Sequence, residues 1–286
     1  MARIRFYQVC IFVALLAGAA VAARRETPSI LFESNYGERL ESGTPEVSLW
    51  WASSGWKVSQ DRVVPKRSGR SLWVELAQNE REAAQLVVRP HRALTGFTAA
   101  ASPLMGPQGS QIPASCVEVL RVRYVHVERP SDGWGVAAPW PDPLPPFKEP
   151  ISLAAEQNQP LWIRVYAPKG TPPGIYEGTI QLNAEGFAAE TPLRVRVYGF
   201  ELPDRATCTS AFGFNASTVY QYHGLADPVD QRLVLDKYWA SFRDHRITPY
   251  CSTPGITPSV SWTTRSPEQC AALRPDDYIV STHRGH

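Results

Sequence analysis

The sequence predicts a mainly β protein, with an antiparallel β-sandwich followed by an incomplete (β/α) barrel segment. Apolar and polar residues alternate with a period of two along residues 158–203, as expected for half-buried strands. After Pro203 the pattern changes to a short strand, an amphipathic helix and a second short strand. Turn-forming clusters such as Pro103–Gly109 separate many short strands earlier in the chain, without an intervening helical period. Together these features favour antiparallel sheets for most of the chain.

The first residues predict a secretory signal peptide over 1–23. Arg3 and Arg5 precede an apolar run over 6–21, and the small residues of Ala20–Ala22 fit a cleavage site. The run is alanine-rich and shorter than the roughly 20 strongly apolar residues of a permanent membrane span. We therefore expect a secreted or periplasmic protein with no stable membrane span once the signal is removed.

Residues 24–203 are predicted to form the N-terminal β-sandwich domain. Alternation predicts three late strands, over Leu161–Tyr166, Tyr176–Leu182 and Leu193–Tyr198. Turns at Pro172–Gly174 and Asn183–Gly186 connect these strands as hairpins. Earlier candidate strands are Ser71–Leu76, Ala84–Arg89 and Val117–Val127. Each late strand is expected to turn one apolar face away from its polar face.

Residues 204–286 are predicted to be the truncated start of a (β/α)₈ catalytic barrel. Thr207–Phe214 forms a short strand, and Asp227 is an N-cap followed by a proline at the first helical position. The helix is expected to gather its apolar side chains on one broad face, formed by Val229, Leu233, Leu235, Tyr238, Trp239 and Phe242. Ile247–Cys251 then returns as a second strand, giving a β-α-β unit that fits either a barrel or a doubly wound sheet.

Composition argues against several classes of partner and cofactor. The net charge is +2 and basic residues form no long run, so no nucleic-acid partner is expected. The histidines lack the spacing of a zinc site, and neither a metal nor a cofactor is predicted. The four cysteines after the signal peptide are expected to be free buried thiols, although their even number also permits disulfides. They are Cys116, Cys208, Cys251 and Cys270.

Four ordered segments resemble glycoside hydrolase family 123. They are Leu49–Pro65, Ala77–Val88, Asn158–Leu182 and Asp244–Tyr250. The resemblance implies an N-terminal β-sandwich and a (β/α)₈ barrel that removes terminal N-acetylgalactosamine from a glycan or glycoconjugate. It also implies a β-N-acetylhexosaminidase-type, substrate-assisted retaining mechanism, an exception to the usual use of a carboxylate nucleophile. In that mechanism the acetamido oxygen attacks the anomeric carbon, an Asp orients the acetamide and an adjacent Glu is the general acid.

The chain departs from the family at its catalytic pair, because it contains no consecutive Asp-Glu. No catalytic residue is therefore assigned, and the chain alone is expected to be inactive. The resemblance also stops after Tyr250, and a frameshift, a premature stop or an incomplete gene model would explain both observations. The alternative is a non-catalytic β-sandwich module that binds glycan or supports another domain.

Five residues are candidates for contact with a carbohydrate. Asn215 and Tyr250 follow or end the two barrel-like strands, where barrel sites assemble, although a turn asparagine and a core tyrosine would occupy the same positions. In the proline-rich loop over 132–147, Trp134 and Trp140 offer flat apolar faces and Asp142 offers acceptors. The competing role for this loop is a stiff strap packed between the two domains.

Glu80 and Glu82 are the remaining pair of carboxylates that invites a catalytic interpretation. They lie at the entrance to the predicted Ala84–Arg89 strand, where turn hydrogen bonds or pairing with Arg81 explain them better. We therefore expect these two glutamates to be structural.

Overall fold

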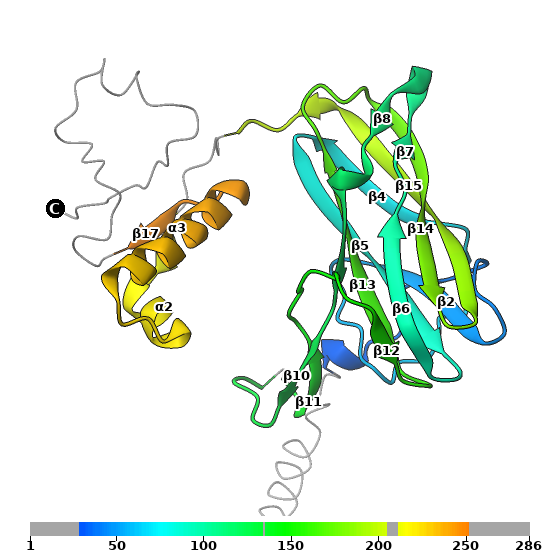
Figure 1. Ribbon diagram of the computed structural model, residues 1–286, viewed down its shortest axis with the longest axis horizontal. Coiled ribbons are helices and arrows are strands. Elements are labelled where there is room, and N and C mark those ends of the chain that lie inside the picture. The colour runs from blue at the N-terminus through cyan, green and yellow to red at the C-terminus, as the bar shows by residue number, and fades with distance from the viewer. Residues whose placement is uncertain (1–28, 134, 205–210, 252–286) are drawn as a thin grey trace, which may run out of the picture. The chain divides into compact units, whose positions relative to one another are not determined.

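The computed structural model describes residues 29–133, 135–204 and 211–251, with the backbone alone described for Tyr250 and Cys251. The chain divides into two compact units, Met1–Phe200 and Glu201–His286. The protein is mainly β, as the strands of the first unit show (Figure 1). The predicted signal peptide lies outside the described residues. The predicted domain boundary after Pro203 remains a prediction.

Two large sheets make up most of the first unit. The six-stranded sheet contains, in spatial order, β3 (Ser68–Gly69), β1 (Glu38–Leu40), β2 (Val47–Ser53), β5 (Glu80–Pro90), β13 (Gln159–Ala167) and β9 (Val117–Arg121). The seven-stranded sheet contains β12 (Ile151–Leu153), β6 (Leu94–Ala101), β14 (Gly174–Ala184), β15 (Phe187–Glu201) and β4 (Leu72–Gln78), with β7 (Leu104–Met105) and β8 (Gln111–Ile112) on a side branch. The three late strands predicted from alternation are present as β13, β14 and β15, and β14 and β15 form the predicted hairpin. The predicted hairpin of β13 and β14 was wrong, because β13 joins the six-stranded sheet and pairs with β5 and β9.

Smaller elements complete the first unit. They are the antiparallel pair β10 (Tyr124–Val127) and β11 (Ala138–Pro141), and the short 3₁₀ helices η1 (Ile30–Phe32), η2 (Pro107–Gly109) and η3 (Ala114–Cys116). The sequence predicted one strand over Val117–Val127, whereas the structure splits it into β9 and β10. The split arises because β9 pairs with β13 and β10 pairs with β11, so the two halves join different sheets.

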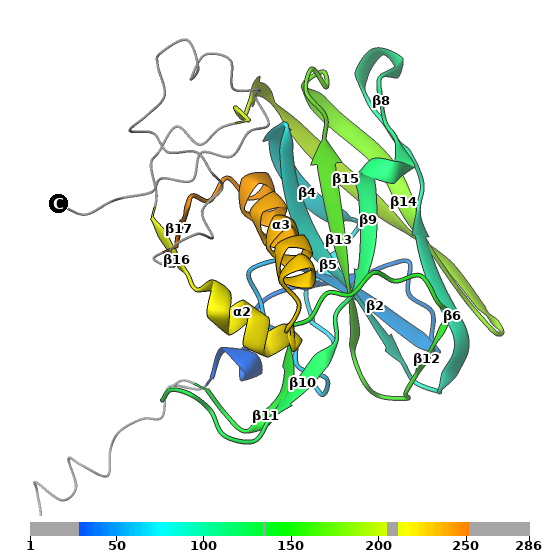
Figure 2. The same ribbon diagram turned by 60° about the vertical axis from the view of Figure 1, so that its left-hand side comes forward.

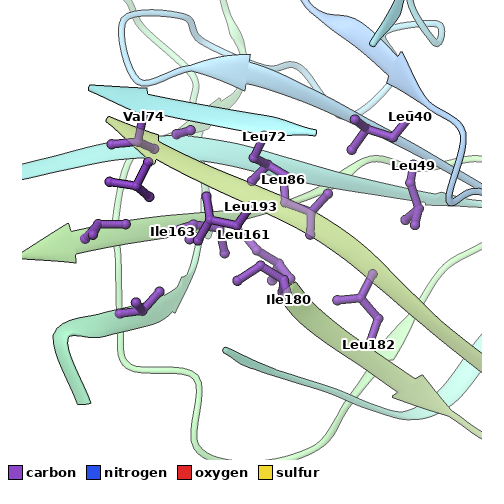
Figure 3. Close-up of a cluster of buried hydrophobic side chains, with 14 of the residues drawn as sticks. Leu40, Leu49, Leu72, Val74, Leu86, Leu161, Ile163, Ile180, Leu182 and Leu193 are labelled. Atoms are coloured by element: carbon purple, nitrogen blue, oxygen red, sulfur yellow. The ribbon is translucent and has the colours of Figure 1, made fainter. Parts of the chain in front are cut away.

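A single hydrophobic cluster joins the two large sheets. Leu161 and Ile163 of the six-stranded sheet and Ile180, Leu182 and Leu193 of the seven-stranded sheet are fully buried in it (Figure 3). The buried faces are the ones that the period of two predicted. Removal of this apolar surface from water is the main favourable contribution to folding of the unit.

Three of the segments that resemble family 123 meet in space. They contain β2, β5 and β13, which are consecutive neighbours in the six-stranded sheet. Two buried polar side chains, Gln85 on β5 and Asn158 directly before β13, bond the backbone at the end of β2 and in the loop that follows it. Gln85 Nε2 donates to the carbonyl oxygens of Ser53 and Trp56 at 3.0 and 2.8 Å, and Asn158 Nδ2 donates to those of Ser59 and Arg62 at 3.0 and 2.7 Å. The irregular backbone of the loop is thereby satisfied by buried side chains.

Arg62 provides a further anchor for this loop. Its Nη2 donates to the carbonyl oxygens of Ser34 and Tyr36, and its guanidinium lies 3.6 Å from the ring centroid of Tyr36 and 4.5 Å from that of Trp50. Burial lowers the pKa of Arg62, because desolvation penalises the charged form. Its Nε and Nη1 have no hydrogen-bond partner among the described residues, so cation–π contacts supply much of the compensation for burying this charge.

The second unit is a β-α-β arrangement with parallel strands (Figure 2). Its elements are β16 (Phe212–Phe214), α2 (Ala216–His223), α3 (Pro228–Asp244) and β17 (Pro249–Cys251). The predicted cap of α3 is confirmed, since Asp227 Oδ1 accepts from the Val229 amide at 2.7 Å. Helix α2 was not predicted. Within the described residues, neither helix is long and apolar enough to cross a membrane.

The predicted apolar face of α3 divides into a buried and an exposed part. Leu235 and Trp239 are buried, and the Phe214 ring of β16 lies 5.0 Å from that of Trp239 between ring centroids. Val229 and Leu233 are instead 67% and 57% exposed. The predicted apolar face is therefore buried in the middle of the helix and exposed in its first turns, where no described segment covers the side chains.

Candidate functional site

The two parallel strands of the second unit place the backbones of Asn215 and Tyr250 near the same edge. β16 and β17 are parallel neighbours, with Gly213 opposite Tyr250 and Phe214 opposite Cys251. Asn215 follows β16 directly, so its backbone lies at the carboxyl end of the pair, where α/β folds place ligands. A role for either residue in sugar binding remains a prediction.

The side chain of Asn215 makes hydrogen bonds within the second unit. Its Oδ1 accepts from the amides of Ser217 and Thr218 at 2.9 and 3.3 Å, and from the Ser217 hydroxyl at 2.7 Å. These contacts make Asn215 the N-cap of α2. The oxygen of the side chain is thus used within the fold, so Nδ2 of this exposed residue is the group that could contact a sugar hydroxyl.

Replacing Asn215 with alanine is expected to destabilise the second unit by about 1 kcal/mol, because it removes the helix cap. Hydrogen exchange of the Ser217 and Thr218 amides should accelerate by roughly fivefold, the factor that corresponds to about 1 kcal/mol. Asn215→Asp, which keeps an acceptor at the same place, should restore protection. Unchanged exchange in Asn215→Ala would contradict the capping role.

The proline-rich loop contributes two described candidates on one segment of the first unit. Trp140, in β11, is half-buried and its Nε1 donates to the carbonyl oxygen of Val136 at 2.8 Å. Asp142 is exposed and its carboxylate lies 3.9 Å from Nζ of Lys57. Trp134 lies outside the described residues. Trp140 and Asp142 therefore lie near the end of β11 and directly after it. They belong to the first unit, whereas Asn215 and Tyr250 belong to the second.

The prolines that follow lie along the six-stranded sheet. The carbonyl oxygens of Pro143 and Pro145 accept from the amides of Arg123 and Arg121 at 2.9 and 3.1 Å. The Phe147 ring stacks on that of Phe97, with centroids 6.0 Å apart. This segment is thus a strap fixed to the first unit, and a contact between the two domains remains a prediction.

Glu80 is the first residue of β5, directly after the turn from β4. Its Oε2 accepts from the Ala77 amide at 2.6 Å, next to Asn79 with its positive φ of 58°. The adjacent Arg81 covers the Tyr166 ring at 4.4 Å from the centroid. These contacts agree with the structural role expected for this cluster.

A cavity lined by Tyr36, Trp51 and Trp56 contains none of the five candidate residues predicted from the sequence. The signal was present as three tryptophans within residues 50–56, inside a segment that resembles family 123. A period of two tells which face of a strand is buried. It does not tell which tryptophan beyond the strand lines a cavity, since the course of the loop decides that.

Comparison with known proteins finds similarity in the first unit. Residues 51–184 match the model of the glycoside hydrolase 123 N-terminal domain. Among solved structures, a family 123 glycoside hydrolase from Clostridium perfringens, studied for glycolipid glycan hydrolysis, is similar with a TM-score of 0.60 and 13% identity. The similarity covers 72% of this chain and 37% of that chain, so the two share a fold over about a third of that protein's length.

A second similar structure is the CooA pilin subunit from enterotoxigenic Escherichia coli. It shares 17% identity over 56% of this chain and 100% of that chain, and its TM-score of 0.29 is too low to support an argument. No curated protein sequence matches this chain. The expected resemblance therefore rests on the domain match over residues 51–184 and on the shared fold, and both confirm it.

Proposed function

We propose that this glycoside hydrolase family 123-like chain is the front part of an exported glycoside hydrolase. Residues 24–203 would form a β-sandwich accessory domain and residues 204–286 the start of a (β/α)₈ catalytic barrel. The match of residues 51–184 to the family's N-terminal domain carries this proposal. The parallel β-α-β arrangement that follows is how such a barrel would begin.

The substrate proposed for the complete protein is a glycan or glycoconjugate with a terminal β-linked N-acetylgalactosamine. The acetamido oxygen attacks the anomeric carbon while a general acid protonates the leaving oxygen, and water then opens the cyclic intermediate with retention of configuration. The first step needs a carboxylate to orient the acetamide and an acid beside it. Since the sequence contains no Asp-Glu dipeptide, we propose that this chain is inactive by itself.

The second candidate is a non-catalytic module that binds glycan or supports another domain. The observation in its favour is the aromatic cavity of the first unit, which lies entirely on the described residues of that unit. Under this alternative the β-α-β unit contributes stability and no chemistry.

The coding sequence beyond His286 separates the two candidates. The hydrolase proposal expects a continuation, in the same or a shifted frame, that encodes further barrel strands and a consecutive Asp-Glu. A locus with neither continuation would overturn the proposal in favour of the non-catalytic module.

A protein that ends at Pro203 is expected to be more soluble than the mature chain. The second unit exposes large apolar side chains, which favour association. They are Phe212, Tyr222, Val229 and Leu233. Sedimentation of both proteins at equal concentration measures the difference, and Leu233→Lys in the mature chain should recover part of it. Equal solubility of the two proteins would show that the second unit needs no further cover.

A further inference from the structure

The first unit contains a cavity of about 600 Å³ at one edge of its six-stranded sheet. This volume falls within the range of about 300–1,000 Å³ that is typical of small-ligand sites. Residues of the segment before β1, of β1, of β2 and of the loop that follows β2 line it, among them Tyr36, Glu38, Trp51, Trp56 and Arg67. The cavity therefore combines aromatic rings with charged groups.

The aromatic wall is held rigidly. The rings of Trp56 and Tyr36 stack with centroids 4.2 Å apart and planes 3° from parallel. Tyr36 is in turn fixed by the guanidinium of Arg62 over its ring and by its hydroxyl, which donates to the carbonyl oxygen of Lys57 at 3.0 Å. Because Tyr36 is almost fully buried while Trp56 is half-buried, Trp56 is the outer ring of this stack.

The backbone that carries Trp56 is equally constrained. The buried Gln85 donates from Nε2 to the Trp56 carbonyl oxygen at 2.8 Å, and the buried Asn158 holds the loop a few residues later. Such a loop loses little conformational freedom when a ligand binds. A preformed aromatic surface in a cavity is a common feature of small-ligand sites.

The charged wall centres on the carboxylate of Glu38. Its Oε2 accepts from Trp51 Nε1 at 3.2 Å, and its Oε1 pairs with Arg67 Nε at 2.9 Å. The Glu38 side chain is 19% exposed and that of Arg67 80% exposed. The carboxylate is thus oriented from two sides, and the guanidinium retains donors that face solvent.

We propose that this cavity binds one hexose or N-acetylhexosamine unit of a glycan. The apolar C–H face of the sugar ring packs on Trp56 and Trp51, and its hydroxyls bond Glu38 and Arg67. The aromatic rings and the oriented polar pair support a ligand with one apolar face and a polar rim. The choice of a sugar over other ligands with these features rests on the proposed function.

Binding of methyl β-N-acetylgalactosaminide and methyl β-galactoside to the mature chain tests this site. Saturation-transfer NMR identifies the sugar face in contact, and tryptophan fluorescence gives the affinity. Trp56→Ala should weaken binding by roughly tenfold or more, the factor expected when an aromatic contact worth about 1.4 kcal/mol is lost. Trp73→Ala is the matched control, because Trp73 is a half-buried tryptophan of β4 outside the cavity.

Arg67→Ala keeps the test decisive if Trp56→Ala alters the fold, because Arg67 is on the surface. It should also weaken binding, whereas Trp73→Ala should leave the affinity unchanged. Absence of sugar binding by the parent chain would overturn the proposal, as would equal affinity of the parent, Trp56→Ala and Arg67→Ala proteins. Such a failure would leave the hydrolase proposal standing, since that proposal is tested separately by the coding sequence and by hydrolysis.

Discussion

Replacing Asn158 with leucine is expected to lower the free energy of unfolding of the first unit by about 3 kcal/mol. Asn158 is 2% exposed, and its side chain donates to Ser59 and Arg62 and accepts from Trp50 Nε1 at 3.4 Å. Leucine has a similar volume and can make none of these hydrogen bonds. Each buried polar group left without a partner costs about 1–3 kcal/mol, and the Arg62 carbonyl oxygen keeps a contact with Arg89.

Urea unfolding followed by near-ultraviolet circular dichroism measures this effect. Asn183→Leu is the matched control, because Asn183 is an exposed asparagine in β14, and its change should stay below about 0.5 kcal/mol. Equal midpoints for the two variants would show that Asn158 does not anchor the loop after β2. The loop that carries Trp56 would then be less rigid than the contacts of Asn158 indicate, and the proposal of a preformed glycan site would be weakened.

Alternation along the chain predicted β13, β14 and β15 with their buried faces correctly. A period of two reports directly which side chains are withdrawn from water, and Leu161, Ile163 and Leu193 are fully buried as expected. The same signal does not identify neighbours in the sheet. β13 lies between β5 and β9 in the sheet, and both of these strands are far from β13 in the sequence. Such pairing depends on long-range contacts, which a local pattern does not report.

The second unit shows where local signals failed. Asp227 followed by proline is a strong start signal, and α3 begins as predicted. Helix α2 went unpredicted because Asn215 was interpreted as a loop residue, although its capping contacts begin a helix of 8 residues. Only Ala216 and Val219 are buried in α2, so its apolar pattern was too short to reveal a helical period.

The sequence predicted the family that the chain resembles, but it did not predict which residues line the cavity. The sequence motifs indicated a resemblance to family 123, and the match of residues 51–184 to the family's N-terminal domain model confirms that resemblance. The sequence directed attention to Trp140 and Asp142, yet it gave no weight to Trp56. The position of Trp56 follows from its stacking on Tyr36 and from the hydrogen bond of Gln85 to its backbone, and neither contact is visible as a local pattern.

A protein of residues 24–286 is expected to show no hydrolysis of a chromogenic β-N-acetylgalactosaminide above a buffer blank. The reason is chemical: neither the Asp that would orient the acetamide nor the adjacent Glu acid is supplied by an Asp-Glu pair in this sequence. A positioned general acid alone contributes about 10²- to 10⁴-fold to the rate, so its absence has a large effect. The matched comparison is the same chain extended through a complete barrel.

Assaying both proteins side by side decides whether hydrolysis needs the rest of the barrel. The short chain should show no activity and the extended protein should be active, with a loss of at least about 10²-fold when the Glu of its Asp-Glu pair becomes Gln. Hydrolysis by the short chain itself would show that the chain is not an inactive front part. The catalytic carboxylates would then have to be sought among residues such as Glu80, Glu82, Asp142 and Asp204.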